Sequence, residues 1–160
     1  MNVRPATVED VPAVLPMVAK ICAFHQALDP AKYSFLPDPQ ERYRGWLAAR
    51  ANDPRSVFLV ADAAAPGEAP RLAGFLVGTV EQEIPIYRLK EFGFIHDLWV
   101  EESYRNEGWA RQLVALAIER LRDIGVKQIR LDVVADNDPA RGLFTASGFR
   151  PSTIEMLTEL

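Results

Sequence analysis

The segment from Arg105 to Ala110 combines residue types that can hold an anion at the start of a helix. The apolar residues that follow Gly108 repeat with a helical period, and a helix start leaves about four backbone N–H groups without acceptors. The helix dipole adds roughly half a positive charge at the same point. Gly108 lets the backbone curl around an oxygen cluster, and Arg105 can add a charge-assisted hydrogen bond. The segment therefore predicts an anion site, for which phosphate is a common occupant.

Two better-known phosphate motifs do not fit this loop. A Walker loop requires a Lys-Ser/Thr pair after its last glycine, and a dinucleotide loop requires three glycines in a tighter pattern. Residues 101–110 contain neither. The structural alternative is a plain strand-to-helix turn with one glycine, so the surrounding residues must decide between the two.

His96 and Asp97 are the candidates for proton transfer, on the strand expected just before the loop. The reference pKa of histidine lies near neutrality, which suits a general base. Side chains alternate along a strand, so His96 and Asp97 should face opposite sides of the sheet. On that basis His96 shares its face with Phe94 and Leu98. The structural alternatives are a packed core histidine and a hydrogen-bonding aspartate without a catalytic role.

The rest of the pattern supplies the elements that position these residues. Thr7 with Asp10 three residues later resembles a capping box, and Gly125 suits the C-terminal end of a helix. The order of elements predicts an α/β sandwich with a mostly antiparallel sheet, in which residues 92–134 form one parallel strand–helix–strand crossover. The expected strands are residues 1–5, 57–61, 72–80, 92–100, 129–134 and 153–160, and the expected helices start near Val11 and span 41–51, 108–124 and 139–146.

Length and composition limit the classes of protein that the chain can represent. Its 160 residues predict a single domain over residues 1–160, and a net charge of −4 argues against non-specific nucleic-acid binding. Cys22 is the only cysteine, which fits a reducing compartment. No apolar run approaches the ~18 residues that span a membrane, and no secretory signal is visible. We therefore expect a cytoplasmic protein without a metal cluster.

Two sequence blocks together resemble the GNAT N-acetyltransferase superfamily. Arg105-x-x-Gly108-x-Ala110 is similar to that family's Arg/Gln-x-x-Gly-x-Gly/Ala signature. One helix and one strand later, the segment from Asn137 to Phe149 resembles the family's Asn-x-x-Ala…Tyr…Gly-Phe segment. The resemblance covers residues 92–150. It implies a GNAT-like α/β fold with a mixed, mostly antiparallel sheet of six to seven strands and helices on both faces.

The resemblance also implies an acetyl-CoA site between two splayed strands, those of residues 92–100 and 129–134. In the family, the loop binds the pyrophosphate, the preceding strand pairs with the pantetheine arm, and the second block reaches the arm and the sulfur. Arg111 or Arg141 would meet the adenosine phosphate. The residues implied to bind the cofactor are Leu98, Trp99, Val100, Arg105, Asn106, Glu107, Gly108, Trp109, Ala110, Arg111, Asn137 and Phe144.

The implied reaction is direct attack of a primary amine on acetyl-CoA in a ternary complex. A lysine-like amine has a pKa near 10.4, so its deprotonation at neutral pH costs about 4–5 kcal/mol and requires a proton acceptor. His96 and Asp97 are the catalytic candidates, with Glu81, Glu83 or water as further bases. A backbone N–H near Val100 would stabilise the oxyanion.

The acceptor is expected to contact the segments 24–46 and 83–92, with Glu83 and Tyr87 as candidate substrate ligands. Phe144 departs from the family, which often has a tyrosine there that can protonate the CoA sulfur. This departure favours an alternative, a non-catalytic acyl-CoA-binding module. A nucleotide enzyme is a third hypothesis, which predicts stabilisation by ATP rather than CoA. The family also makes a homodimer through the last strand compatible with this sequence.

Overall fold

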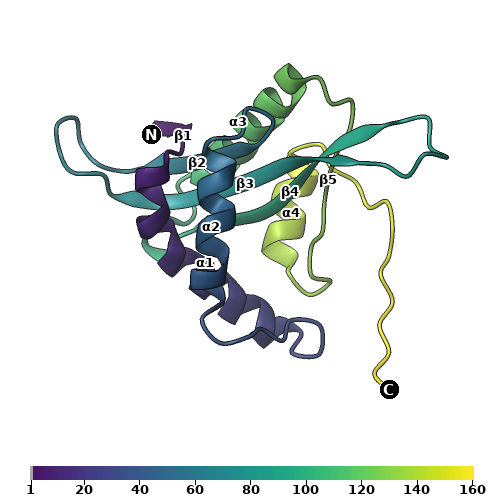
Figure 1. Cartoon of the computed structure of the whole chain (residues 1–160). Coiled ribbons are helices and arrows are strands. Elements are labelled where there is room, and N and C mark those ends of the chain that lie inside the picture. Colours follow the sequence, from purple (N-terminus) through teal and green to yellow (C-terminus); the bar gives the residue numbers. More distant parts are fainter. Residues whose placement is uncertain (1) are drawn as a thin grey trace.

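Five strands form one sheet in the order β1-β2-β3-β4-β5, and helices cover both of its faces (Figure 1). The computed structural model describes residues 2–160, so Met1 of the first predicted strand lies outside them. The elements are β1 (Asn2–Pro5), η1 (Val8–Asp10), α1 (Val11–Leu28), α2 (Pro39–Ala51), β2 (Val57–Asp62), β3 (Leu72–Gln82), β4 (Glu91–Val100), η2 (Glu102–Tyr104), α3 (Trp109–Ile124), β5 (Ile129–Leu131) and α4 (Asp138–Ala146).

The predicted α/β class and the mostly antiparallel sheet are confirmed. β1, β2, β3 and β4 pair in antiparallel order, and β4 pairs with β5 in parallel. β2 and β3 form an antiparallel hairpin, and α3 provides the predicted crossover between β4 and β5. Gly125 ends α3 in the left-handed conformation, at φ 104°.

Two apolar cores lie on opposite faces of the sheet, because alternate side chains of each strand point to opposite sides. Phe75 and Val77 of β3 pack with α1 and α2, whereas Leu76 between them packs with α3. On the α3 side, the fully buried residues of the helix are Leu113, Val114, Ala117 and Leu121.

The C-terminal part of the sheet differs from the prediction. Residues 153–160 form no strand, so the described sheet has five strands rather than six or seven. The segment runs away from the body of the protein (Figure 1), and Ile154 and Met156 are 85% and 88% exposed. β5 ends at Leu131 rather than at Val134 because its pairing with β4 stops there. Strand propensity was present in both segments, but propensity does not supply a partner strand.

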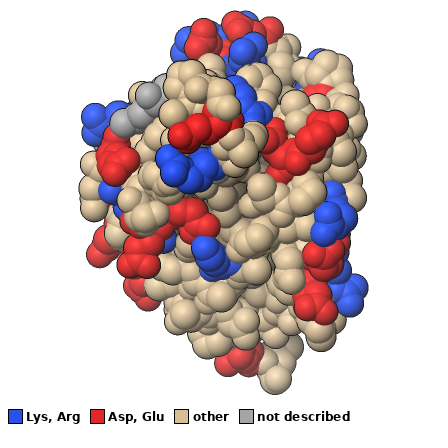
Figure 2. Space-filling model, turned by 90° about the vertical axis from the view of Figure 1, so that its left-hand side faces the viewer, with Lys and Arg blue, Asp and Glu red and all other residues tan. Residues whose placement is uncertain are grey.

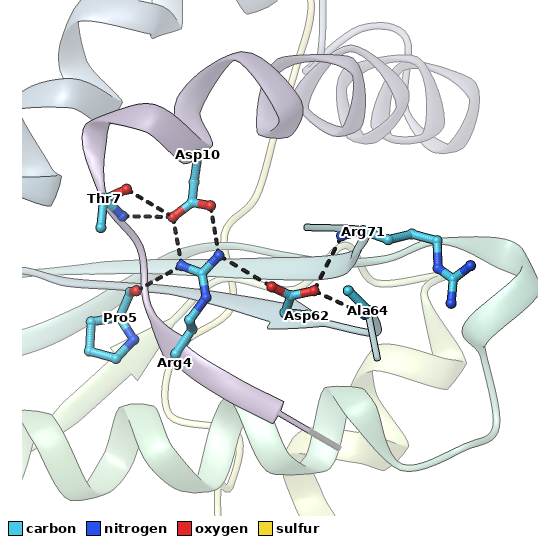
Figure 3. Close-up of polar contacts among 7 residues, drawn as sticks. All are labelled: Arg4, Pro5, Thr7, Asp10, Asp62, Ala64 and Arg71. Carbon is cyan, nitrogen blue, oxygen red and sulfur yellow. Dashed lines mark hydrogen bonds and ion pairs between the residues drawn. The ribbon is translucent and has the colours of Figure 1, made fainter. Parts of the chain in front are cut away.

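An ion-pair cluster joins β1, η1 and the end of β2 (Figure 3). Arg4 binds Asp10 through two hydrogen bonds of 2.7 and 2.9 Å, and its Nη2 also lies 3.4 Å from Asp62 Oδ2. Asp10 and Asp62 are buried, so their charges need these partners. Further hydrogen bonds to the two carboxylates come from the backbone N–H groups of Thr7, Ala64 and Arg71.

The N-terminal helical stretch corrects one expectation. Val8–Leu28 is long and apolar enough to cross a membrane by length and composition, since an 18-residue window within it has a mean hydropathy of 1.4. In this fold the stretch lies along one face of the sheet, where Val14 and Val18 are buried. A core helix passes the same test of length and composition, so the finding is weak evidence for a membrane segment.

Charges are interspersed on the face that Figure 2 presents. Lys and Arg side chains alternate there with Asp and Glu side chains, and the tan area between them is uncharged. Neither sign of charge dominates this face.

Gly74 lets two strands approach closely beside the predicted cofactor strand. A Cβ at this position would lie 2.3 Å from the backbone oxygen of Trp99. We expect Gly74→Ala to lower the free energy of unfolding by about 1–3 kcal/mol, measured by urea denaturation. Gly45→Ala is the control, because nothing lies within 4 Å of its Cβ and alanine favours a helix interior; it should stabilise by roughly 0.5–1 kcal/mol. Equal stabilities for the two variants would contradict the contact.

Candidate active site

A β-bulge at His96 interrupts the pairing of β3 and β4. Val77 pairs with Asp97 and Gly78 pairs with Ile95, so His96 is an extra residue without a register partner in β3. A bulge of this kind disrupts the strict alternation of side chains and redirects the extra residue. The bulge thus changes the direction expected for His96.

His96 and Asp97 both contact α2, so the prediction that they face opposite sides was wrong. The His96 ring lies edge-on to the Trp46 ring with centroids 5.2 Å apart. Asp97 accepts a 2.6 Å hydrogen bond from the hydroxyl of Tyr43, one helical turn before Trp46. Leu98 packs on the opposite side, in the core formed with α3. His96 therefore does not share a face with Leu98 as predicted.

His96 has polar and aromatic neighbours on the same face of the sheet. Its Nε2 lies 2.7 Å from Thr79 Oγ1 and 3.6 Å from Glu81 Oε1. Its ring is edge-on to Phe94, the neighbour that the alternation predicted, at 5.0 Å. The side chain is 28% exposed, so an incoming group can reach it. This geometry combines a partly accessible imidazole with a hydroxyl and a carboxylate.

The surroundings of His96 favour its neutral form. Burial lowers its pKa below the ordinary 6.5, against smaller raising effects of the Asp97 and Glu81 carboxylates; Arg50 of α2 adds to the lowering. A histidine that is neutral near pH 7 can accept a proton. This is the protonation state that a general base needs.

Asp97 lies deeper than His96 and is already engaged by Tyr43. Burial raises the pKa of its carboxyl, and the Tyr43 hydrogen bond opposes this rise. Burial, followed by the nearby Asp97 charge, raises the pKa of Tyr43. The sequence did not single out this pairing, which joins β4 to α2 and fixes both side chains. Asp97 as a base thus remains a prediction.

The loop between β4 and α3 has the backbone that an anion site requires. Gly108 adopts the left-handed conformation at φ 92° and precedes the first residue of α3. Gln112 N–H donates to the Gly108 carbonyl, so the N–H groups before it in the first turn have no helical acceptor. Asn106 is also left-handed, at φ 64°. Such turns direct successive N–H groups to one side, which fits a pyrophosphate.

Side chains hold this loop in place. The Arg105 guanidinium lies over the Trp99 ring, 5.0 Å from its centroid, and its Nε donates to the Val100 carbonyl at 3.2 Å. Trp109 is buried, and its indole N–H donates to Glu107 at 3.2 Å. Arg111 is exposed on the first turn of α3. The predicted loop residues therefore lie together around one helix start.

β4 and β5 separate immediately beside the bulge. Their last register pair is Ile95 with Leu131, and β5 ends there. The β4 backbone from His96 to Val100 therefore has no strand partner on its β5 side within residues 2–160. The backbone groups of such an edge can form hydrogen bonds with an extended molecule that contains amide groups, such as pantetheine. The pairing thus ends at the point where the predicted site between the two strands would begin, and a splay of the strands with a cofactor between them remains a prediction.

The segment from Asn137 to Phe149 caps α4 and contributes to the core on the α3 side. Asn137 caps α4, and its Oδ1 accepts from the Ala140 N–H at 3.2 Å. Phe144 is 8% exposed and packs edge-on against Phe149, in the core on the α3 side. Arg141 donates to the Ala135 carbonyl at 3.2 Å. Contact of these residues with a cofactor remains a prediction.

The two candidate substrate ligands lie at the far end of the β3–β4 hairpin. Glu83 is bound by Arg130 at 2.5 Å, and its side chain is only 12% exposed. The Arg130 guanidinium also covers the Phe92 ring, 3.9 Å from its centroid. Tyr87 is 50% exposed. Glu83 is thus engaged within the protein, whereas Tyr87 is free to contact another molecule.

Sequence reasoning missed Thr79 as a neighbour of His96. Thr79 is polar yet 4% exposed, in a β3 segment whose other residues are mostly apolar. Its position two residues after Val77 and two before Glu81 places all three on one face, which was a usable signal. Among the described residues no group of three or more His, Cys, Asp or Glu side chains is arranged to hold a metal.

The sequence of this chain is similar to those of known acetyltransferases. The profile of the Acetyltransferase (GNAT) family matches residues 21–149. The uncharacterized N-acetyltransferases YycN and YdgE of Bacillus subtilis (strain 168) are 32% identical over 89 residues and 30% identical over 76 residues. The matches cover 56% and 48% of this chain, and 54% and 48% of those proteins, so the chain spans about half the length of the curated relatives it matches.

A solved structure extends the likeness to the whole fold. The F44R variant of the BH1408 protein from Bacillus halodurans has a TM-score of 0.83 and 23% identity, covering 100% of this chain and 99% of that one. At this identity the likeness concerns the fold. The family profile spans most of the chain, from α1 to the end of the second block. The chain belongs to the Acetyltransferase (GNAT) family.

Proposed function

We propose that the chain transfers an acetyl group from acetyl-CoA to a primary amine of a small molecule or protein. The observation that carries the proposal is the position of His96. It lies where β4 leaves β5, on the strand that leads to the Gly108 helix start. One site would thus combine a proton acceptor, an open strand edge and a phosphate loop.

The residues have distinct roles in this proposal. The first-turn N–H groups of α3 and Arg105 bind the pyrophosphate, and the free edge of β4 aligns the pantetheine arm. The bound thioester supplies the acetyl group. His96 takes the proton of the amine, for which its neutral form is suited by the burial that lowers its pKa. Phe144 has no hydroxyl, so the thiolate leaves without a proton from this position.

The amine is expected to enter between the α1–α2 connection and the β3–β4 hairpin. Tyr87 is exposed there and remains a candidate substrate ligand, whereas Glu83 forms an ion pair with Arg130. A reducing cytoplasmic location is part of the proposal, in line with the single cysteine. A homodimer remains a proposal that gel filtration would test.

Acetyl-CoA binding provides the first test. We expect acetyl-CoA to raise the Tm of the wild-type protein and thiol release to require an added amine. Gly108→Glu should abolish the rise in Tm, because the carboxylate would occupy the anion site and a side chain at φ 92° would distort the turn. The measurement is a thermal shift with acetyl-CoA and, as a comparison, ATP.

Gly125→Glu is the matched control for backbone strain. Gly125 has φ 104° at the other end of the same helix, with nothing within 4 Å of its Cβ position. Its variant should lose some stability but keep the acetyl-CoA shift. Retention of the shift in Gly108→Glu would overturn the loop assignment. A shift with acetyl-CoA but no thiol release on any amine would support the non-catalytic module instead.

A further inference from the structure

A carboxylate, a hydroxyl and an imidazole form a continuous chain of polar contacts at the bulge. Thr79 Oγ1 lies 2.5 Å from Glu81 Oε1 and 2.7 Å from His96 Nε2. Glu81 and His96 themselves are 3.6 Å apart, too far for a direct hydrogen bond. Thr79 therefore mediates between them, and it is buried at 4% exposure. Neither its burial nor its partners is explained by acetyl-CoA binding.

The protons available to Glu81, Thr79 and His96 fix the direction of each hydrogen bond between them. A threonine hydroxyl has one proton to donate, and an ionised carboxylate can only accept. The short contact to Glu81 is of the charge-assisted kind, so Thr79 donates its proton to Glu81. The Thr79 oxygen then has only lone pairs to offer to His96. His96 must therefore carry its proton on Nε2, which donates to Thr79.

Because the proton lies on Nε2, Nδ1 of His96 has a free lone pair. No described side chain or backbone group makes a hydrogen bond to Nδ1, and the imidazole is partly exposed. Which nitrogen carries the proton decides which one can act as a base, and the partner of the other nitrogen sets it. The position of Thr79 therefore determines the reactive atom.

We propose that Thr79 and Glu81 are positioning residues that hold His96 as the Nε2–H tautomer, so that Nδ1 accepts the proton of the acceptor amine. This inference rests on the proposed function. In the step, the N–H bond of the amine breaks, its electron pair stays on nitrogen, and the proton forms an Nδ1–H bond. The resulting imidazolium keeps its Nε2–H bond to Thr79, and Glu81 stabilises its positive charge both through that hydroxyl and directly, at 3.6 Å from Nε2.

The other groups around His96 do not replace this arrangement. Asp97 of β4 adds an attractive charge but directs its carboxylate to Tyr43, and Arg50 of α2 is repulsive. Trp46 and Phe94 flank the ring without a described hydrogen bond to it. Glu81, reached through Thr79, is thus the one carboxylate within the described residues that is hydrogen-bonded to the imidazole through an intermediary.

Nitrogen-15 NMR of histidine tests the tautomer without any activity measurement. The chain has two histidines, so a His25→Gln variant assigns the signals. We expect wild-type His96 to show a protonated Nε2 and an unprotonated Nδ1 above its pKa. A protonated Nδ1 in the wild type would overturn the inference. Failure of acetyl transfer with every amine, with this spectrum intact, would instead count against the proposed function alone.

Thr79→Val removes the hydroxyl while keeping the shape, and Thr79→Ser is the matched control that retains it. In Thr79→Val we expect the pKa of His96 to fall by about 1 unit, and kcat to fall about 10-fold with KM for acetyl-CoA unchanged. Thr79→Ser should restore both toward the wild type, and Glu81→Gln should also lower the same pKa, because the Glu81 carboxylate raises it. An unchanged His96 pKa in Thr79→Val would overturn the inference, and the serine variant guards against a loss of folding.

Discussion

Replacement of His96 by glutamine is expected to lower kcat/KM for the acceptor amine by about 10²–10⁴-fold, the usual contribution of a general base. Glutamine can still accept or donate at Thr79 but cannot take up a proton near neutral pH. The bulge, the Trp46 contact and the loop at Gly108 do not depend on the imidazole charge. Acetyl-CoA should therefore raise the Tm of the variant as it does that of the wild type.

The pH profile adds a second readout for His96. Burial lowers its pKa below 6.5, so the base is neutral at pH 7 and becomes protonated only at lower pH. Wild-type kcat/KM should thus fall on the acid side, through the lowered pKa of His96. The His96→Gln variant should lose this acid limb. The same acid limb in the variant would mean that another group is titrating.

Asp97→Asn separates the two catalytic candidates. An asparagine oxygen can still accept the hydrogen bond from Tyr43, so the contact between β4 and α2 should persist. We expect this variant to retain activity within about 10-fold of the wild type, because the Asp97 carboxylate is engaged and more deeply placed than His96. A severe loss in Asp97→Asn with an active His96→Gln would transfer the role of base to Asp97.

The loop and its helix were predictable because their signals are local. A glycine in the left-handed region before an apolar stripe and another after it define both ends of α3. The capping segment at Thr7 was visible for the same reason. In each case the residue that determines the conformation lies within four positions of the residues that it affects.

The direction of His96 was not predictable, because a bulge depends on the register between two strands. Nothing near His96 marks it as the extra residue, and the register shift involves Val77 and Gly78 of β3, at least 18 positions earlier in the chain. The missing last strand has a related cause. Residues 153–160 contain suitable apolar side chains, but a strand also needs a neighbour. Several residues of the candidate site, though not Thr79, could therefore be listed from the sequence, but their arrangement could not be derived from it.

Replacement of Asp10 by alanine is expected to lower the free energy of unfolding at pH 7 by about 3 kcal/mol. This value is near the lower end for breaking a buried pair, because Arg4 keeps 29% side-chain exposure and can be partly rehydrated. The loss has two parts. Arg4 loses a two-bond partner, and the Thr7 N–H loses its acceptor at the start of the helical segment. Urea denaturation at neutral pH measures the change.

The pH dependence of this variant distinguishes the ion pair from simple loss of packing. The Arg4 hydrogen bond lowers the pKa of Asp10 in the folded protein, despite the opposing effect of burial. The carboxylate therefore stabilises the fold above its unfolded pKa of about 3.9, and this stabilisation is lost as the pH falls through the lower folded value. The gap between wild type and Asp10→Ala should thus be full at pH 7 and shrink below about pH 4.

Arg44→Ala provides the control, since Arg44 and Glu41 form an exposed pair with side chains 47% and 53% accessible. This variant should lower the free energy of unfolding by less than about 1 kcal/mol, because water screens the two charges and hydrates each of them when the pair is broken. A gap for Asp10→Ala that stays constant down to pH 3 would contradict the ionic explanation and attribute the loss to the missing volume. A gap no larger than that of Arg44→Ala would mean that the Arg4 cluster does not stabilise the junction of β1, η1 and β2, despite its burial.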